Sequence, residues 1–151
     1  MDSKAFFKLS YGVYIISTSA DNKEGGCVIN TLTQVTSSPA RLSIALNKEN
    51  YTLKLIETSG TFSAAVLSDD VEMDLLRRFG FQCGKDVKTY DGIPQGRDSL
   101  NNPYPTEAVC ARFPCRVVSS MDVGPPMTIA GEVVAADVLD TKTPALNPPN
   151  S

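Results

Sequence analysis

The feature that most restricts the fold is a succession of short segments rich in β-branched and aromatic residues, separated by glycine, proline and asparagine turns. Strands are expected at residues 11–19, 27–36, 41–46, 61–67, 108–118 and 127–139. Only brief helical patterns interrupt them, at 2–9, 51–58 and 68–79. This order predicts a mainly β fold, an antiparallel barrel rather than a doubly wound sheet.

Two segments lack such periodicity. Residues 85–107 carry glycine, proline and asparagine throughout and are expected to form a long loop. Residues 141–151 form a proline-rich tail with little to bury, which we expect to be mobile. The sequence therefore predicts one domain over 1–140, followed by the tail.

Charge, histidine content and cysteine spacing exclude several classes of protein. The net charge of −3 disfavours binding to nucleic acid or to an anionic membrane, and no apolar run approaches the about 20 residues that cross a bilayer. We expect a cytoplasmic protein. The absence of histidine excludes Ser-His-Asp and Cys-His catalysis. No metal site is predicted, because the cysteines form no Cys-x-x-Cys pair: Cys27, Cys83, Cys110 and Cys115.

Two polar segments are candidates for binding a phosphate and the edge of a heterocycle. Residues 30–38 carry hydroxyl and amide groups at high density, a pattern equally typical of a solvent-facing strand edge. Residues 47–52 precede a predicted helix, whose N-terminal N–H groups attract phosphate, and Lys48 adds positive charge. Taken alone, this second segment is better explained by Asn50 as an N-cap and Lys48 as a solvated side chain.

A third candidate combines aromatic and glycine residues. Residues 79–86 place Phe79 and Phe81 on either side of Gly80, an arrangement that lays a ring against a flat ligand. The alternative is a helix end whose phenylalanines enter the core. Asp69, with its acidic neighbours up to Asp74, is interpreted as a solvated helix start, and no catalytic residue is predicted.

Taken together and in this order, the motifs resemble the flavin-reductase-like family of FMN-binding split barrels, especially flavoredoxin and the flavin domain of rubredoxin-fused proteins. The resemblance covers residues 4–139 and rests on Lys8-Leu9-Ser10-Tyr11-Gly12-Val13-Tyr14, Asn30-Thr31-x-x-Gln34-Val35-Thr36, Asn47-Lys48-x-Asn50-x-Thr52, Phe79-Gly80-Phe81-x-x-Gly84-Lys85-Asp86 and Gly131-Glu132-Val133-Val134. It implies an antiparallel, Greek-key-like split barrel that holds FMN noncovalently between two identical subunits.

The resemblance also implies a set of flavin contacts. Phosphate and ribityl contacts would come from Thr36, Ser37, Lys48, Asn50 and Thr52. Contacts along the isoalloxazine ring would come from Asn30, Thr31, Gln34 and Val35, with Leu32 and Asn47 in the same two motifs. The pocket would be covered by Phe79, Phe81, Gly84, Lys85 and Asp86. Hydride transfer to a flavin needs position and electronic tuning rather than a side-chain acid or base, which suits a chain without histidine.

Three functions stay open on this basis. The first is an NAD(P)H-dependent flavin reductase, and the second an electron-transfer protein that relays electrons between protein partners such as a rubredoxin. Gly124-Pro125-Pro126 favours the second, because relatives often carry there a histidine associated with the nicotinamide donor. The third is a module that binds flavin without turnover.

Overall fold

The structure, a computed structural model, describes residues 1–9, 12–80, 90–139 and 145, apart from the side chain of Phe7. Its elements in chain order are η1 (Ser3–Lys8), β1 (Tyr14–Ala20), β2 (Lys23–Ile29), β3 (Leu32–Ser37), β4 (Ala40–Asn47), α1 (Tyr51–Ser59), β5 (Thr61–Leu67), α2 (Met73–Gly80), β6 (Gln95–Arg97), β7 (Pro103–Pro105), β8 (Val109–Asp122), β9 (Pro126–Val133) and β10 (Asp137–Val138). The predicted mainly β class is confirmed. None of the described helices is long and apolar enough to cross a membrane.

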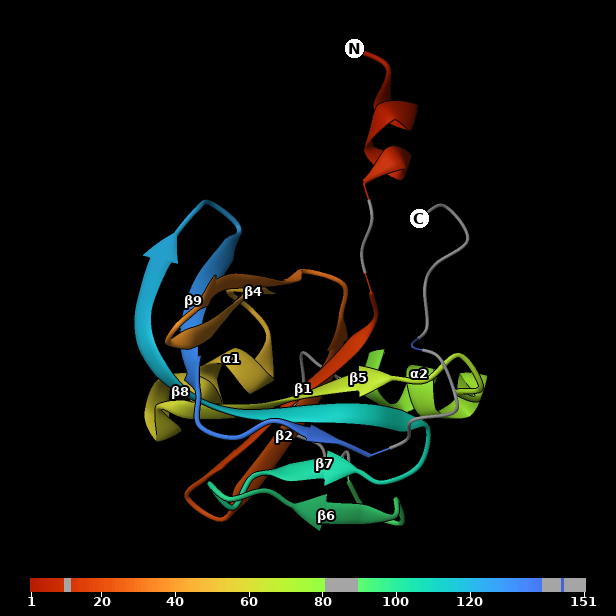
Figure 1. Cartoon of the computed structure of the whole chain (residues 1–151), viewed down its shortest axis with the longest axis vertical. Helices are drawn as coiled ribbons and strands as arrows, with labels where there is room; N and C mark the ends of the chain where they lie inside the picture. Colours follow the sequence, from red (N-terminus) through yellow and green to blue (C-terminus); the bar gives the residue numbers. More distant parts are fainter. Residues whose placement is uncertain (10–11, 81–89, 140–144, 146–151) are drawn as a thin grey trace.

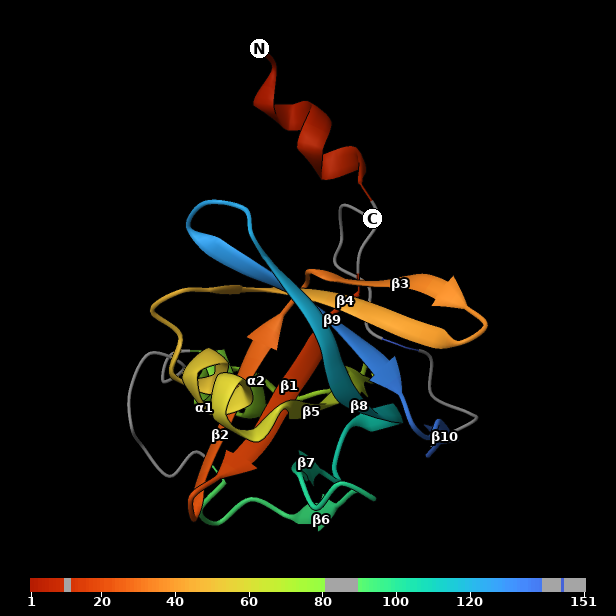
Figure 2. The same cartoon turned by 90° about the vertical axis from the view of Figure 1, so that its left-hand side faces the viewer.

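One curved antiparallel sheet forms the body, with the strand order β2-β1-β5-β8-β9-β4-β3 (Figures 1 and 2). The short strand β10 pairs with β8, and β6 pairs with β7 in a separate ribbon. β2 and β3 are consecutive in the chain, yet they stand at opposite ends of the strand order. The predicted antiparallel barrel is therefore confirmed, and it is split between these two strands.

The long strand β8 joins the two halves of the sheet. Its first half pairs with β5 up to Arg116, and its second half pairs with β9 from Cys115 onward. The register with β9 shifts between Val117 and Ser119, and such an irregularity bends a strand and increases its twist. The bend lets the hairpin of β8 and β9 rise above α1, as Figure 2 shows.

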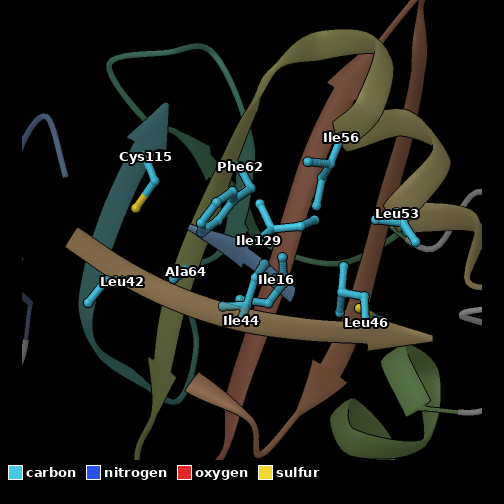
Figure 3. Close-up of a cluster of buried hydrophobic side chains, with 11 residues drawn as sticks. Ile16, Leu42, Ile44, Leu46, Leu53, Ile56, Phe62, Ala64, Cys115 and Ile129 are labelled. Atoms are coloured by element: carbon cyan, nitrogen blue, oxygen red, sulfur yellow. The ribbon is translucent and has the colours of Figure 1, made fainter. Parts of the chain in front are cut away.

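The central strands β1 and β5 separate two hydrophobic cores, because successive side chains of a strand point to opposite faces. Ile16 and Ala64 face the barrel core, which also receives Phe62 of β5 and Ile56 of α1 (Figure 3). On the other face, a smaller core lies against α2, and its buried members are Ile15, Ala65, Leu67, Phe79, Tyr90 and Val109. Burial on both faces explains why adjacent residues of these strands are both apolar, as at Ile15–Ile16 and Ala64–Ala65, instead of alternating with polar ones.

Both ends of α1 follow from the sequence. The side chain of Asn50 accepts a hydrogen bond from the backbone N–H of Thr52 at 2.8 Å, as an N-cap does. Gly60 closes the helix at φ 71°, in the left-handed region that glycine enters without strain. The predicted helix at 51–58 and its glycine stop are confirmed.

Several expected boundaries are wrong. The expected strand 27–36 is two strands, β2 and β3, which meet at the Asn30–Thr31 turn, and β2 begins already at Lys23 within the expected polar turn. The expected loop 85–107 contains β6 and β7. The helix expected from residue 68 begins at Met73, and the helix expected at 2–9 is the 3₁₀ helix η1, which covers Ser3–Lys8 and projects from the body (Figure 1). Most of the expected tail lies outside the described residues.

A close approach between β9 and β5 gives a stability prediction. A Cβ atom added at Gly131 would lie 2.6 Å from Cε1 of Phe62 and 2.9 Å from Cβ of Cys115, both fully buried. Gly131→Ala is therefore expected to lower the free energy of unfolding by about 1–3 kcal/mol through overpacking, measured by urea denaturation. Gly80→Ala is the matched control, because no atom of the described part of the chain lies within 4 Å of its added Cβ. Equal stability of the two variants would contradict the packing described here.

Candidate functional site

The strand β3 presents the first polar segment at an exposed edge of the sheet. Among the described strands it pairs only with β4, and all its residues except Leu32 are exposed. An edge strand leaves a row of backbone N–H and C=O groups without sheet partners, and a planar ligand with a polar edge can pair with them. The register with β4 shifts between Gln34 and Thr36, which places Val35 in the irregularity with half of its surface exposed.

Hydroxyl groups fix both ends of this strand. Thr31 Oγ1 donates a hydrogen bond to the carbonyl oxygen of Ala45 at 2.8 Å, which ties the Asn30–Thr31 turn to β4. At the other end, Thr36 Oγ1 donates to the carbonyl oxygen of Pro39 at 2.6 Å. These two hydrogen bonds anchor the ends of β3 to the chain around β4 and leave its outer edge uncovered.

The second polar segment connects β4 to α1, and its members differ in exposure. Asn50 and Thr52 are 8% and 1% exposed, so their side chains lie inside the protein. Thr52 Oγ1 is buried without a hydrogen-bond partner and lies beneath Gly25 of β2. Asn47 is exposed at the end of β4, and Lys48 follows it in the turn. Lys48 is the only cation of the predicted set among the described residues.

Lys48 is held by the hairpin between β8 and β9. Its backbone N–H donates to the carbonyl oxygen of Pro125 at 3.0 Å, and its Nζ lies 2.7 Å from both carboxylate oxygens of Asp122. Asp122 Oδ1 also accepts a hydrogen bond from the N–H of Gly124 at 3.0 Å. The bond from Lys48 and then that from Gly124 hold the pKa of Asp122 below its usual range.

The structure brings some predicted residues together and separates others. The Asn30–Thr31 turn and Asn47 lie at one end of the β3–β4 pair, since Leu32 pairs with Ile44. Thr36 and Ser37 lie at the other end, where they pair with Arg41 and Ala40. At about 3.3 Å per residue, the two ends are roughly 15–20 Å apart. One phosphate therefore cannot contact both Lys48 and Thr36 of the same chain. A ligand that contacts both residues must either extend along β3 or bind Lys48 of one copy of the chain and Thr36 of another.

Only the first two residues of the third segment, 79–86, belong to the part of the chain that the structure describes. Phe79 is fully buried in α2, where its ring packs edge-on against Tyr90 with centroids 5.1 Å apart and lies under Gly26 of β2. It belongs to the smaller core and presents no ring beside β3. The remaining predicted members of this segment fall outside the described residues: Phe81, Gly84, Lys85 and Asp86.

Sequence reasoning missed Asp122 and Pro125 as neighbours of Lys48. The two segments are more than seventy residues apart in the chain, and the hydrogen bond between Lys48 and Asp122 spans 74 positions. Only the pairing of β4 with β9, in which Asn47 lies opposite Pro126, brings them together. An acidic residue just before a Gly-Pro-Pro turn carries no local signal of that partner.

Two ionisable side chains outside the candidate site, Cys115 and Tyr90, are buried and stay neutral at physiological pH. Burial is the main cause that raises the pKa of Cys115 to about 12, followed by the charge of Asp98, so the thiol stays neutral at physiological pH. Burial also raises the pKa of Tyr90, whose hydroxyl forms a hydrogen bond with Ser17. Among the described residues, no group of three or more histidine, cysteine or acidic side chains could hold a metal ion. The described residues of the candidate site therefore offer groups for binding and positioning a ligand.

A cavity of about 400 Å³ lies elsewhere, between α2 and the segments that flank β6 and β7. Its lining includes Arg78 and four carboxylates, those of Asp70, Glu72, Asp74 and Glu107, and none of the predicted flavin contacts that the structure describes lines it. The four carboxylates disfavour a phosphate-bearing ligand there, because like charges repel. The candidate site thus remains the β3 edge and the Asn47–Lys48 turn.

Comparison with known proteins gives consistent matches over nearly the whole chain. The family model of the flavin reductase like domain matches residues 6–148. The chain is 35% identical over 139 residues to a ferric-chelate reductase (NAD(P)H) of Archaeoglobus fulgidus, covering 92% of this chain and 82% of that protein. It is 32% identical over 139 residues to a high molecular weight rubredoxin of Moorella thermoacetica, covering 92% of this chain and 61% of that protein.

Solved structures share the fold at low sequence identity. An NADH:FAD oxidoreductase of Streptomyces globisporus superposes with a TM-score of 0.86 at 18% identity, covering 95% of this chain and 84% of that one. Flavoredoxin of Methanosarcina acetivorans superposes with a TM-score of 0.77 at 20% identity, covering 85% of this chain and 69% of that one. These likenesses show the split-barrel architecture.

Proposed function

The chain belongs to the family of flavin reductase like domains, and on that premise we propose that it binds FMN and acts as an NAD(P)H-dependent flavin reductase. Electrons would pass from the nicotinamide donor to the bound flavin. The 35% identity to a ferric-chelate reductase that is named for NAD(P)H supports this choice of donor.

The observation that carries the proposal is the position of Asn47 and Lys48 at the same end of the β3–β4 pair as the Asn30–Thr31 turn. FMN consists of a flat ring with hydrogen-bonding edges, a polyol chain and a phosphate. The residues present fit these parts: backbone groups and hydroxyls along β3, and the ammonium group of Lys48.

Roles for the chain's own residues follow from this placement. Lys48 would bind the phosphate, and the edge of β3 from Leu32 to Val35 would orient the ring. Asn50 would act through the start of α1, which its side chain fixes. The bound flavin supplies the redox chemistry. The protein would position it, and the site needs no proton donor of its own for hydride transfer.

The proposal includes a homodimer in the cytoplasm. Four apolar side chains are about half exposed or more on β3 and on the β8–β9 hairpin: Val35, Val118, Met121 and Val123. Exposed apolar surface of this kind is typical of a protein interface. A second copy would also supply the far end of β3 to a shared site. Sedimentation of flavin-loaded protein tests this arrangement, and a monomer with flavin bound would contradict it.

A second function is favoured by the turn between β8 and β9. Pro125 accepts the backbone hydrogen bond of Lys48, so this turn serves to hold the lysine, and it carries no histidine for a nicotinamide donor. The chain would then relay electrons between proteins, with a rubredoxin-like partner. The relative in Moorella thermoacetica that is named a high molecular weight rubredoxin supports this alternative.

An anaerobic absorbance titration distinguishes the two functions. FMN-loaded protein is mixed with NADH and, separately, with NADPH, and bleaching of the flavin band is followed in time. We expect rapid bleaching by at least one of them. Flavin that bleaches only with dithionite or with a reduced protein partner would instead indicate electron transfer. Protein that takes up no FMN would contradict both functions.

A further inference from the structure

The ion pair between Lys48 and Asp122 bears directly on the phosphate end of the proposed site. Lys48 Nζ lies 2.7 Å from each carboxylate oxygen, so one carboxylate already occupies two of its three donor directions. The side chains are 43% and 63% exposed, so a ligand can reach both from solvent. The charge that would attract a phosphate is therefore already paired.

The hairpin holds this pair in place from two sides. The backbone of Lys48 is bound to Pro125, and Asn47 pairs with Pro126 across β4 and β9. Asp122 is fixed in turn by the N–H of Gly124 at 3.0 Å. The carboxylate consequently stays close to Lys48 when a ligand arrives, rather than swinging away with a mobile loop.

From this geometry we propose that Asp122 weakens the binding of the flavin phosphate, because it competes with the phosphate for Lys48 and repels its negative charge. Asp122 is a positioning residue that acts through Lys48. The inference rests on the proposed function, in which Lys48 binds the phosphate of FMN. Its consequence is a flavin held loosely enough at its phosphate end to exchange, as a flavin that serves as substrate must.

The isosteric variant Asp122→Asn isolates the charge. An amide oxygen can still accept the hydrogen bond from Gly124, so the turn is kept while the competing charge is removed. We expect the dissociation constant of FMN to fall about two- to fivefold at low salt, the range that exposed ion pairs allow. The gain should shrink in 0.5 M salt, which screens exposed charges. Riboflavin, which has no phosphate, should bind wild type and variant equally.

Two further proteins complete the experiment, with flavin fluorescence quenching as the measurement. Asp137→Asn is the matched control, because Asp137 forms a similar exposed ion pair with Arg112 at 3.1 Å, on β10 and β8 outside the site. It removes the same net charge and should leave FMN affinity unchanged. In the double variant Lys48→Met with Asp122→Asn, the gain from Asp122→Asn should fall to less than half.

The outcomes separate this inference from the proposed function. Unchanged or weaker FMN binding by Asp122→Asn would overturn the inference alone, provided that wild-type protein binds FMN. An equal gain for FMN and riboflavin would also overturn it, since the effect would then come from the hairpin's shape. A wild-type protein that binds neither flavin would overturn the proposed function, and the inference with it.

Discussion

Replacing Lys48 by alanine is expected to raise the dissociation constant of FMN by about 10- to 30-fold, while that of riboflavin changes little. A hydrogen bond to a charged group is worth about 1.5–3 kcal/mol, and the lower part of that range applies because Lys48 is partly exposed. The variant also leaves Asp122 without its ammonium partner near the phosphate. Equilibrium titration with both flavins measures the difference between them.

The matched control is Lys54→Ala. Lys54 is exposed on α1 and carries the same charge, but it is not among the predicted contacts. Its loss should leave both dissociation constants within about twofold of wild type, because screening weakens exposed charges at a distance. If Lys48→Ala binds FMN as tightly as this control, the phosphate lies elsewhere. Thr36→Ala then tests the other end of β3 in the same assay.

Phe62→Ala is expected to lower the free energy of unfolding by about 3–5 kcal/mol. The ring of Phe62 is fully buried in the barrel core (Figure 3), and it fills the space left by Gly131 on β9. Truncation removes that contact and leaves a cavity. The strands around it are held by their hydrogen-bonded pairing, so they cannot move together to fill it. Urea denaturation followed by far-UV circular dichroism measures the loss.

Phe6→Ala provides the comparison for this core variant. Phe6 is 56% exposed on η1, which projects from the body, so its removal should change stability by no more than about 0.5 kcal/mol. A loss for Phe62→Ala as small as that for Phe6→Ala would mean that the barrel core is not packed as described.

Local signals made part of the fold predictable. The helix α1 could be located because its N-cap Asn50 and its stop Gly60 are neighbours in sequence of the residues they bind. The strands β6 and β7 were missed because each has three residues and lies among glycine, proline and asparagine. They are held by tertiary contacts instead: the buried side chain of Asn102 accepts from the backbone of Ser19 at 3.1 Å, far away in the chain.

The candidate site shows the same division. Its polar segments stand out in the sequence because hydroxyl and amide groups gather there beyond what a buried strand needs. What the sequence does not reveal is the competition for Lys48, since Asp122 reaches it only through the pairing of β4 with β9. The burial of Thr52 was equally hidden, because it depends on close approach to Gly25 of β2, whereas the burial of Phe79 agrees with the alternative of a helix end that enters the core.

The place of β8 and β9 in the strand order also sets the order in which the chain can fold during synthesis. Both strands lie between β5 and β4, yet the ribosome makes them after every other strand of the main sheet except β10. Until they emerge, β5 and β4 each keep one edge without a partner, and such edges invite pairing with other chains. The nascent protein therefore depends on the segment from residue 109 onward to pair these two edges, and a chain whose synthesis stops before that residue keeps them open in addition to the outer edges of β2 and β3.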